Sequence, residues 1–182
     1  MLIIISGTSG SGKNTVISEL LKRNENIQFL KSCTTRKRRP NESEDSYIFL
    51  SKPNFDDKLK NGEIFEHEEI HQNFYGLSQA SLNEVVDCHE NNMHFIKDLG
   101  VLGQISVKQH LKNRVKVLSI FLTVPKTVLI ERLRKRGEQD IDLRISRMEF
   151  EEGYMKNFDF IVQNISLDKT VKKIEKIIKK TY

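Results

Sequence analysis

The sequence predicts an α/β fold in which a parallel β-sheet is covered by helices on both faces. Short runs of Ile, Leu and Val alternate along the chain with longer stretches whose apolar residues recur every three or four positions. The short runs are apolar at nearly every position, which is typical of strands buried on both faces. The intervals between them are long enough for the helical crossovers that parallel strands need.

The N-terminal part of the chain supplies the first strand and helix of this alternation. Leu2–Ser6 is almost purely aliphatic and predicts a buried strand. Lys13–Arg23 carries aliphatic residues at helical spacing and predicts a helix with one apolar face.

The second half of the chain continues the pattern. The predicted elements are strands over Met93–Ile96, Val115–Val124 and Phe158–Val162, helices over Val101–Lys112 and Lys126–Arg136, and a lysine-rich C-terminal helix whose apolar face holds Val171, Ile174, Ile177 and Ile178.

Two stretches break the alternation. Residues 32–82 are rich in charge and hold two strand-like pieces, at Tyr47–Leu50 and Glu63–Ile70, so we interpret them as a subdomain inserted into the core. Gly137–Asp142 is polar and irregular, which is typical of a lid. The predicted division of this single domain is a core of about 1–31, 83–135 and 145–182, an insertion of about 32–82 and a lid of about 136–144.

Length and composition indicate a soluble globular protein. The chain has 182 residues, of which 37% are hydrophobic and 30% charged, and this is neither a disordered nor a membrane composition. Cys33 and Cys88 have no framework spacing and predict free thiols. Leu2–Ile5 is too short for a signal peptide or a membrane span, so we expect a cytoplasmic protein with no membrane partner. The net charge of +5 favours anionic ligands.

A glycine-rich loop joins the first predicted strand to the first predicted helix. Its sequence, Gly-Thr-Ser-Gly-Ser-Gly-Lys at residues 7–13, fits the phosphate-binding pattern G-x-x-x-x-G-K. Glycines let successive backbone N–H groups point at phosphate oxygens, and the helix N-terminus adds positive potential. The motif in this position predicts a three-layer P-loop NTPase fold that binds ATP. The candidate ATP-binding residues are Gly7, Thr8, Ser9, Gly10, Ser11, Gly12, Lys13, Asn14 and Thr15.

The residue after the loop lysine departs from this pattern. A Ser or Thr hydroxyl at this position ligates Mg²⁺ in P-loop proteins, whereas this chain has Asn14. An amide oxygen is also a usable ligand for Mg²⁺. Asn14 is therefore a candidate magnesium ligand.

A second cluster of phosphate-binding residue types lies between residues 32 and 49. It reads Ser-Cys-Thr-Thr-Arg-Lys-Arg-Arg-Pro-Asn-Glu at 32–42 and Tyr-Ile-Phe at 47–49. Arg36, Arg39 and the phenol of Tyr47 suit a clamp for a second phosphate, because guanidinium binds phosphate through two parallel hydrogen bonds. Taken alone, the arginines fit a solvated basic run or a nucleic-acid patch equally well.

The two motifs together resemble the guanylate kinase family of P-loop nucleoside monophosphate kinases. The family pattern S-x-T-T-R-x-x-R-x-x-E followed by Y-x-F lies at residues 32–49, and the likeness extends over nearly the whole chain. The resemblance implies an enzyme that transfers the γ-phosphoryl group of ATP to GMP with Mg²⁺, giving ADP and GDP in purine nucleotide metabolism. It also implies that the chain is a monomer or a homodimer.

The resemblance assigns roles to particular residues. Arg36, Arg39, Tyr47 and Tyr75 would hold the phosphate of GMP. Ser32 and Glu66 would contact the guanine, and the Glu66 carboxylate can accept hydrogen bonds from both N1–H and the 2-amino group. Because the attacking phosphate oxygen is already ionised, catalysis needs positioning and charge stabilisation rather than a general base. The implied residues are Ser32, Arg36, Arg39, Tyr47, Glu66, Tyr75 and Asp98 for GMP, Lys13, Arg132, Arg136 and Arg144 for catalysis, and Asn14 and Asp98 for Mg²⁺.

Three departures from the family pattern keep other hypotheses open. Leu77 and Gly100 stand where the family commonly has polar side chains, and they motivate a kinase for another phosphorylated acceptor, such as ribose 1,5-bisphosphate. Asn14 motivates a non-catalytic guanylate-kinase-like module that binds a partner. A nucleic-acid partner is not expected, because the basic residues lack interleaved aromatic platforms.

One further segment matches the sequence pattern of a metal site. His67-Glu-Glu-Ile-His71 matches the zinc-protease pattern H-E-x-x-H, which needs a helix to bring both imidazoles to one face. We expect a strand and a loop in this segment, and therefore no zinc.

Overall fold

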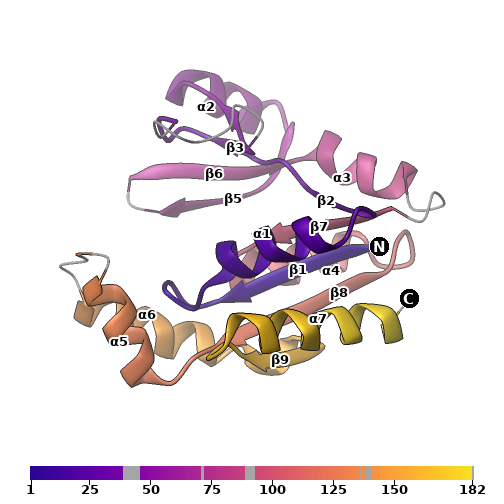
Figure 1. Cartoon of the computed structure of the whole chain (residues 1–182). Helices are drawn as coiled ribbons and strands as arrows, with labels where there is room; N and C mark the ends of the chain where they lie inside the picture. Colours follow the sequence, from indigo (N-terminus) through magenta and orange to yellow (C-terminus); the bar gives the residue numbers. More distant parts are fainter. Residues whose placement is uncertain (39–45, 71, 89–92, 136, 138–140, 182) are drawn as a thin grey trace.

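The computed structural model has a five-stranded parallel sheet at its centre (Figure 1). The residues that it describes are 1–38, 46–70, 72–88, 93–135, 137 and 141–181. The strand order is β2-β7-β1-β8-β9, and all four neighbouring pairs are parallel. The strands are β1 (Leu2–Gly7), β2 (Ile27–Phe29), β7 (His94–Asp98), β8 (Val117–Thr123) and β9 (Phe160–Gln163).

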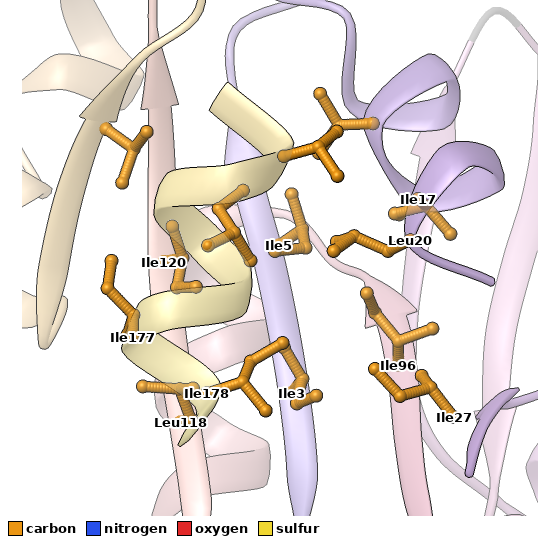
Figure 2. Close-up of a cluster of buried hydrophobic side chains, with 14 of the residues drawn as sticks. Ile3, Ile5, Ile17, Leu20, Ile27, Ile96, Leu118, Ile120, Ile177 and Ile178 are labelled. Carbon is orange, nitrogen blue, oxygen red and sulfur yellow. The ribbon is translucent and has the colours of Figure 1, made fainter. Parts of the chain in front are cut away.

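Helices cover both faces of this sheet, which confirms the predicted fold class. Alternate residues of β1 point to opposite faces, so Ile3 and Ile5 pack with α1 (Lys13–Arg23) and α7 (Leu167–Thr181). Leu2 and Ile4 pack on the other face with α3 (Gln79–Asp87) and α4 (Val101–His110). Figure 2 shows the first of these clusters, with Ile177 and Ile178 of α7 over the strands.

The C-terminal helix has the amphipathic form that the sequence predicts. Val171 and Ile174 are fully buried, and Ile177 and Ile178 are nearly so, while the lysines of α7 lie on its outer side. None of the helices in the described part of the chain is long and apolar enough to cross a membrane.

A second, four-stranded sheet lies above the central sheet in Figure 1, in the order β4-β3-β6-β5. The strand-like pieces predicted near residues 47–50 and 63–70 are confirmed as β4 and β5. The elements of this part are β3 (Cys33–Thr34), β4 (Ile48–Phe49), α2 (Lys52–Lys60), β5 (Ile64–Ile70) and β6 (Asn73–Ser78). The boundary predicted at residue 82 falls inside α3, and the division into core, insertion and lid stays a prediction.

Two more helices lie on the side toward which β1 points (Figure 1). They are α5 (Lys126–Lys135) and α6 (Ile141–Glu152), and a short 3₁₀ helix, η3 (Met155–Asn157), leads from α6 to β9. Ile141 and Asp142, expected in an irregular lid, form the first turn of α6. Arg136 and residues 138–140 lie outside the described residues.

The carboxyl ends of β1, β7 and β8 meet at one edge of the central sheet, because all three strands are parallel. The connection that leaves β1 passes to β2, whereas the one that leaves β7 passes to β8, on the other side of β1. Ligands of open α/β sheets bind at such a reversal of strand order, outside the carboxyl ends. This edge is therefore the place to look for a site.

Candidate active site

The loop between β1 and α1 has the curled backbone that phosphate binding requires. Gly7, Gly10 and Gly12 have φ angles of 138°, 90° and 92°, in the left-handed region that favours glycine. A Cβ on Gly7 would lie 2.2 Å from the carbonyl oxygen of Leu122, so a side chain there would push β1 away from β8. This loop shape therefore requires glycine at position 7.

Side chains from distant elements hold the outer side of this loop. Asn164 Nδ2 donates to the carbonyl oxygen of Ser11 at 2.7 Å, and Arg132 Nη1 donates to the same oxygen at 3.3 Å. Arg132 Nη2 also donates to the carbonyl of Asn164 at 2.9 Å. Arg132, expected on the transferred phosphoryl group, thus contacts the loop backbone and does not line the cavity described below.

The loop itself carries a buried lysine and two buried hydroxyl groups. Lys13 Nζ donates to the carbonyls of Gly7 and, at 3.2 Å, Thr8. Burial lowers the pKa of Lys13, and the carboxylates of Glu151 and Asp98 act against this shift. The hydroxyl oxygens of Thr8 and Ser11 are buried and have no hydrogen-bond partner within the described chain.

A cavity of about 280 Å³ connects this loop to the second sheet and to α6. Many of the residues predicted from the sequence line it, although they are up to 137 positions apart in the chain. These are Gly7, Ser9, Lys13, Asn14, Ser32, Arg36, Tyr47, Glu66, Tyr75, Asp98 and Arg144. Thr8, Gly10, Ser11, Gly12 and Thr15 belong to the loop and first turn but do not line the cavity, and Arg39 lies outside the described residues.

Two aromatic rings lie beside Arg36 at the far end of the cavity. The guanidinium of Arg36 lies 5.5 Å from the ring centre of Tyr47 and 5.8 Å from that of Phe49. The Tyr47 and Tyr75 rings meet edge to face at 6.0 Å. This packing restrains a flexible cation, and the two tyrosines line the same cavity, which suits a phosphate group.

Glu66 reaches the cavity because β5 carries a bulge. The pairing of β5 with β6 shifts between Ile64 and Glu66, so Phe65 and Glu66 both turn toward α4. Phe65 stacks on His110 with 4.3 Å between ring centres, and Glu66 lies against Gly103. Burial, reinforced by the nearby Glu68 carboxylate, raises the pKa of Glu66 to about 7, and Lys97 opposes the shift.

Gly103 leaves the space that the Glu66 carboxylate occupies. A Cβ on Gly103 would lie 2.5 Å from Glu66 Oε1. We expect Gly103→Ala to keep or slightly raise thermal stability, because alanine favours a helix by about 1 kcal/mol over glycine. If Glu66 binds the acceptor base, the variant should still raise the KM for the acceptor about tenfold, since the carboxylate must move.

The control for this variant is Ser106→Ala, at an exposed position of the same helix. It raises helix propensity without touching Glu66. Steady-state kinetics with both variants would check the prediction, and an unchanged KM in Gly103→Ala would contradict the role of Glu66.

Four charged residues that line the cavity were not predicted from the sequence: Lys97, Glu68, Arg147 and Glu151. Arg147 bonds to the Glu68 carboxylate and, through Nε at 3.2 Å, to Glu151 Oε1. This chain of charges links β5 to α6. Two features of the sequence could have indicated that Lys97 and Glu68 belong to the site. Lys97 interrupts an apolar strand, and Glu68 follows Glu66 at strand spacing. Arg147 and Glu151 could not be placed because the helix α6 was not predicted.

Oxygen ligands suitable for Mg²⁺ gather on the loop side of the cavity. Asp98 and Asn14 line it next to Lys13, and Glu151 Oε2 is buried without a hydrogen-bond partner in the part of the chain described. No group of three or more His, Cys, Asp and Glu side chains within the described ranges is placed to hold a metal ion by itself. This donor set fits Mg²⁺, which usually takes one or two protein ligands and completes its shell with phosphates and water.

The described part of the H-E-x-x-H segment lies in a strand and not in a helix. His67 lies in the strand β5, and its ring packs against Phe55 with 6.5 Å between centres. The partner histidine, His71, lies outside the described residues. The expected strand is confirmed, and it lacks the helical spacing that zinc ligation by this motif requires.

Comparison with known proteins places the chain in a family. The family model described as guanylate kinase matches residues 1–181. A guanylate kinase of Prochlorococcus marinus is 39% identical over 98% of this chain and 96% of its own length, and one of Thermotoga maritima is 35% identical over 98% and 86%. The crystal structure of guanylate kinase from Anaplasma phagocytophilum superposes with a TM-score of 0.76 at 27% identity, over 98% of this chain and 84% of that one. The chain belongs to the guanylate kinase family.

Proposed function

We propose that this member of the guanylate kinase family transfers the γ-phosphoryl group of ATP to GMP, giving ADP and GDP. One observation carries the proposal. A single cavity is lined at one end by the phosphate loop with Lys13 and at the other by Arg36, Tyr47 and Glu66. A donor phosphate and an acceptor phosphate can therefore meet within one cavity.

The donor end binds the phosphates of ATP. Residues 7–15 surround them with backbone N–H groups, the N-terminus of α1 and the unpartnered hydroxyls of Thr8 and Ser11. Lys13 leaves the loop carbonyls and pairs with the β and γ phosphates. Arg132 fixes the loop from outside, and Arg144, whose Nη1 donates to Ser9 Oγ at 3.2 Å, approaches from α6.

The acceptor end binds GMP. Arg36, Arg39, Tyr47 and Tyr75 hold its phosphate. Glu66 accepts hydrogen bonds from N1–H and the 2-amino group of guanine, and Ser32 and Asp98 complete the contacts to the nucleoside. A site that hydrogen-bonds its substrate in this way rejects bases that leave the buried groups unpaired.

Asn14 and Asp98 would hold Mg²⁺ between the two ends. The ion, when bound, supplies positive charge to the phosphate oxygens as the phosphoryl group moves. The protein contributes Lys13, Arg144 and the lid residue Arg136 as further positive charges. Arg147 belongs with them, because it lines the same cavity and is held in place by Glu68 and Glu151.

The raised pKa of Glu66 predicts a pH dependence for acceptor binding. Only the ionised carboxylate accepts from both guanine donors, and the pKa is about 7, so kcat/KM for GMP should rise between pH 6 and pH 8. The phosphate of GMP also ionises near pH 6. The measurement is therefore the pH profile of kcat/KM for GMP in the wild type and in Glu66→Gln. The variant should keep only the change that comes from ionisation of the GMP phosphate.

The raised pKa of Glu66 also determines how folding stability changes with pH. An acid whose pKa is raised on folding contributes stability below its unfolded pKa and loses it as the pH rises through the folded pKa. Glu66→Gln should thus increase the melting temperature more at pH 8 than at pH 5. Equal changes at both pH values would contradict the burial of this carboxylate.

A coupled assay of ADP formation tests the proposed function. It supplies ATP and Mg²⁺ with GMP, dGMP, AMP, UMP, CMP or ribose 1,5-bisphosphate. We expect turnover with GMP far above that with AMP, UMP, CMP or the sugar bisphosphate. Turnover only with the sugar bisphosphate, or with none of the acceptors, would reject the proposal.

A further inference from the structure

Lys97 is a buried lysine to which the proposed reaction gives no role. It lies in β7 of the central sheet, where its side chain is only 4% exposed, and it lines the cavity. Burial lowers the pKa of Lys97, and the Asp98 carboxylate acts against this shift. Removing an ammonium group from water is unfavourable unless the group finds partners. A lysine in such a strand therefore points to a ligand or a structural ion pair.

The partners of Lys97 belong to the acceptor end of the cavity. Its Nζ donates to Ser32 Oγ at 2.8 Å and lies 3.4 Å from Asp98 Oδ1. The ring centres of Phe29 and Tyr47 are 4.5 Å and 5.3 Å away. These contacts hold the ammonium beside the side chains that surround the acceptor nucleoside.

This arrangement gives the pocket a donor side and an acceptor side. Ser32 Oγ accepts from Lys97, so the hydroxyl hydrogen of Ser32 is directed elsewhere and can be donated to a ligand. Lys97 keeps further N–H donors of its own. Glu66 lines the same cavity and, when ionised, only accepts.

Purines divide into two classes against such a pocket. A 6-oxopurine presents an acceptor at O6 beside a donor at N1–H, whereas a 6-aminopurine presents a donor at C6 beside an acceptor at N1. The first class matches a donor side next to an acceptor side. A 6-aminopurine would place its 6-amino group against the ammonium of Lys97 and its N1 acceptor against the carboxylate of Glu66. Neither pair can form a hydrogen bond, so buried groups would stay unpaired.

We propose that Lys97 determines the specificity for the acceptor base, by supplying, directly and through the Ser32 hydroxyl, the donor side that selects a 6-oxopurine over a 6-aminopurine. The inference rests on the proposed function only in placing the purine at this end of the cavity. Lys97 also provides the positive charge that opposes the raised pKa of Glu66 and so favours the accepting form of that carboxylate.

The test is equilibrium binding of GMP, IMP and AMP, measured by calorimetry on Lys97→Met and the wild type. Methionine keeps the length of the side chain and removes the donor. We expect GMP and IMP to bind about 10- to 100-fold more weakly to the variant, with the GMP/IMP ratio unchanged, because the two share O6. The GMP/AMP ratio should fall by a similar factor.

Lys108→Met is the matched control. Lys108 also bonds a serine hydroxyl and an aspartate, Ser119 Oγ at 3.3 Å and Asp159 Oδ1 at 2.6 Å, but it does not line the cavity. The Lys108→Met variant should leave the ratio of GMP to AMP affinity unchanged. The melting temperature of Lys97→Met should fall by no more than a few degrees, because methionine fills the same space and Asp98, which loses its partner, has a side chain that is 25% exposed.

An unchanged GMP/AMP ratio in Lys97→Met would overturn the inference, as would wild-type protein that binds GMP no better than AMP. Loss of all nucleotide binding together with a larger fall in melting temperature would also overturn it, because Lys97 would then be structural. Binding is measured without ATP or turnover. A failure of the proposed reaction, seen in the ADP assay, is therefore distinct from a failure of this inference.

Discussion

Replacement of Lys13 by methionine is expected to lower kcat about 10³-fold. The ammonium is held by the carbonyls of the phosphate loop and lines the cavity at its donor end, where negative charge moves during transfer. Removing one preorganised donor of this kind slows enzymes by about 10²- to 10³-fold, and Lys13 also carries a full charge. Single-turnover rates with saturating ATP and GMP would measure the loss.

Lys22→Met is the control for this experiment. Lys22 lies on the same helix, α1, and its side chain is 71% exposed. Its replacement should leave kcat unchanged. A Lys13→Met protein that folds and keeps more than a tenth of the wild-type rate would show that the loop does not act on the transferred group.

Replacement of Arg36 by methionine is expected to reduce kcat/KM for GMP about 10²-fold or more. Its guanidinium lies beside the Tyr47 and Phe49 rings and lines the acceptor end of the cavity. Loss of one partner of a buried charge pair costs about 2–5 kcal/mol, which converts to this range. The KM for ATP should change little, because Arg36 lies at the other end of the cavity.

Two further variants make this result specific. Arg36→Lys keeps the charge but loses the planar fork, and it should fall between wild type and Arg36→Met. Arg38→Met removes an exposed arginine of the same basic run that does not line the cavity. If Arg38→Met matched Arg36→Met, the run would act through its total charge and not as a clamp.

The central sheet could be predicted because its strands are buried on both faces. A run such as Leu2–Ser6 leaves few other interpretations, and the loop that follows has a strong sequence signature. The predicted limits of α1 agree with the structure, because the glycine loop precedes its first turn and Asn24 follows its last turn.

The second sheet and α6 were harder to predict. β3 and β4 have only two residues each, and α6 has a mixed polar sequence with few buried residues. The bulge that turns Glu66 into the cavity depends on pairing with β6, which no local pattern reveals. The role of Gly103 likewise follows from a residue 37 positions away in the chain.

The departures from the family pattern have partial explanations in the structure. Leu77 lies opposite Glu66 in the β5–β6 pair and is buried in the apolar cluster beneath α3 and α4. A Cβ on Gly100 would lie 2.6 Å from Glu68 Oε2, so glycine there leaves room for the carboxylate that binds Arg147. Both residues thus fit the packing around the two glutamates.

The most direct test of the account follows the phosphoryl group itself. ATP labelled in its γ-phosphoryl group is incubated with the protein, Mg²⁺ and GMP, and the products are separated by chromatography. We expect the label to appear in GDP at a rate that matches ADP formation and that falls about 10³-fold in Lys13→Met. Label that appears only in inorganic phosphate, or that stays in ATP while GMP is bound, would contradict the account.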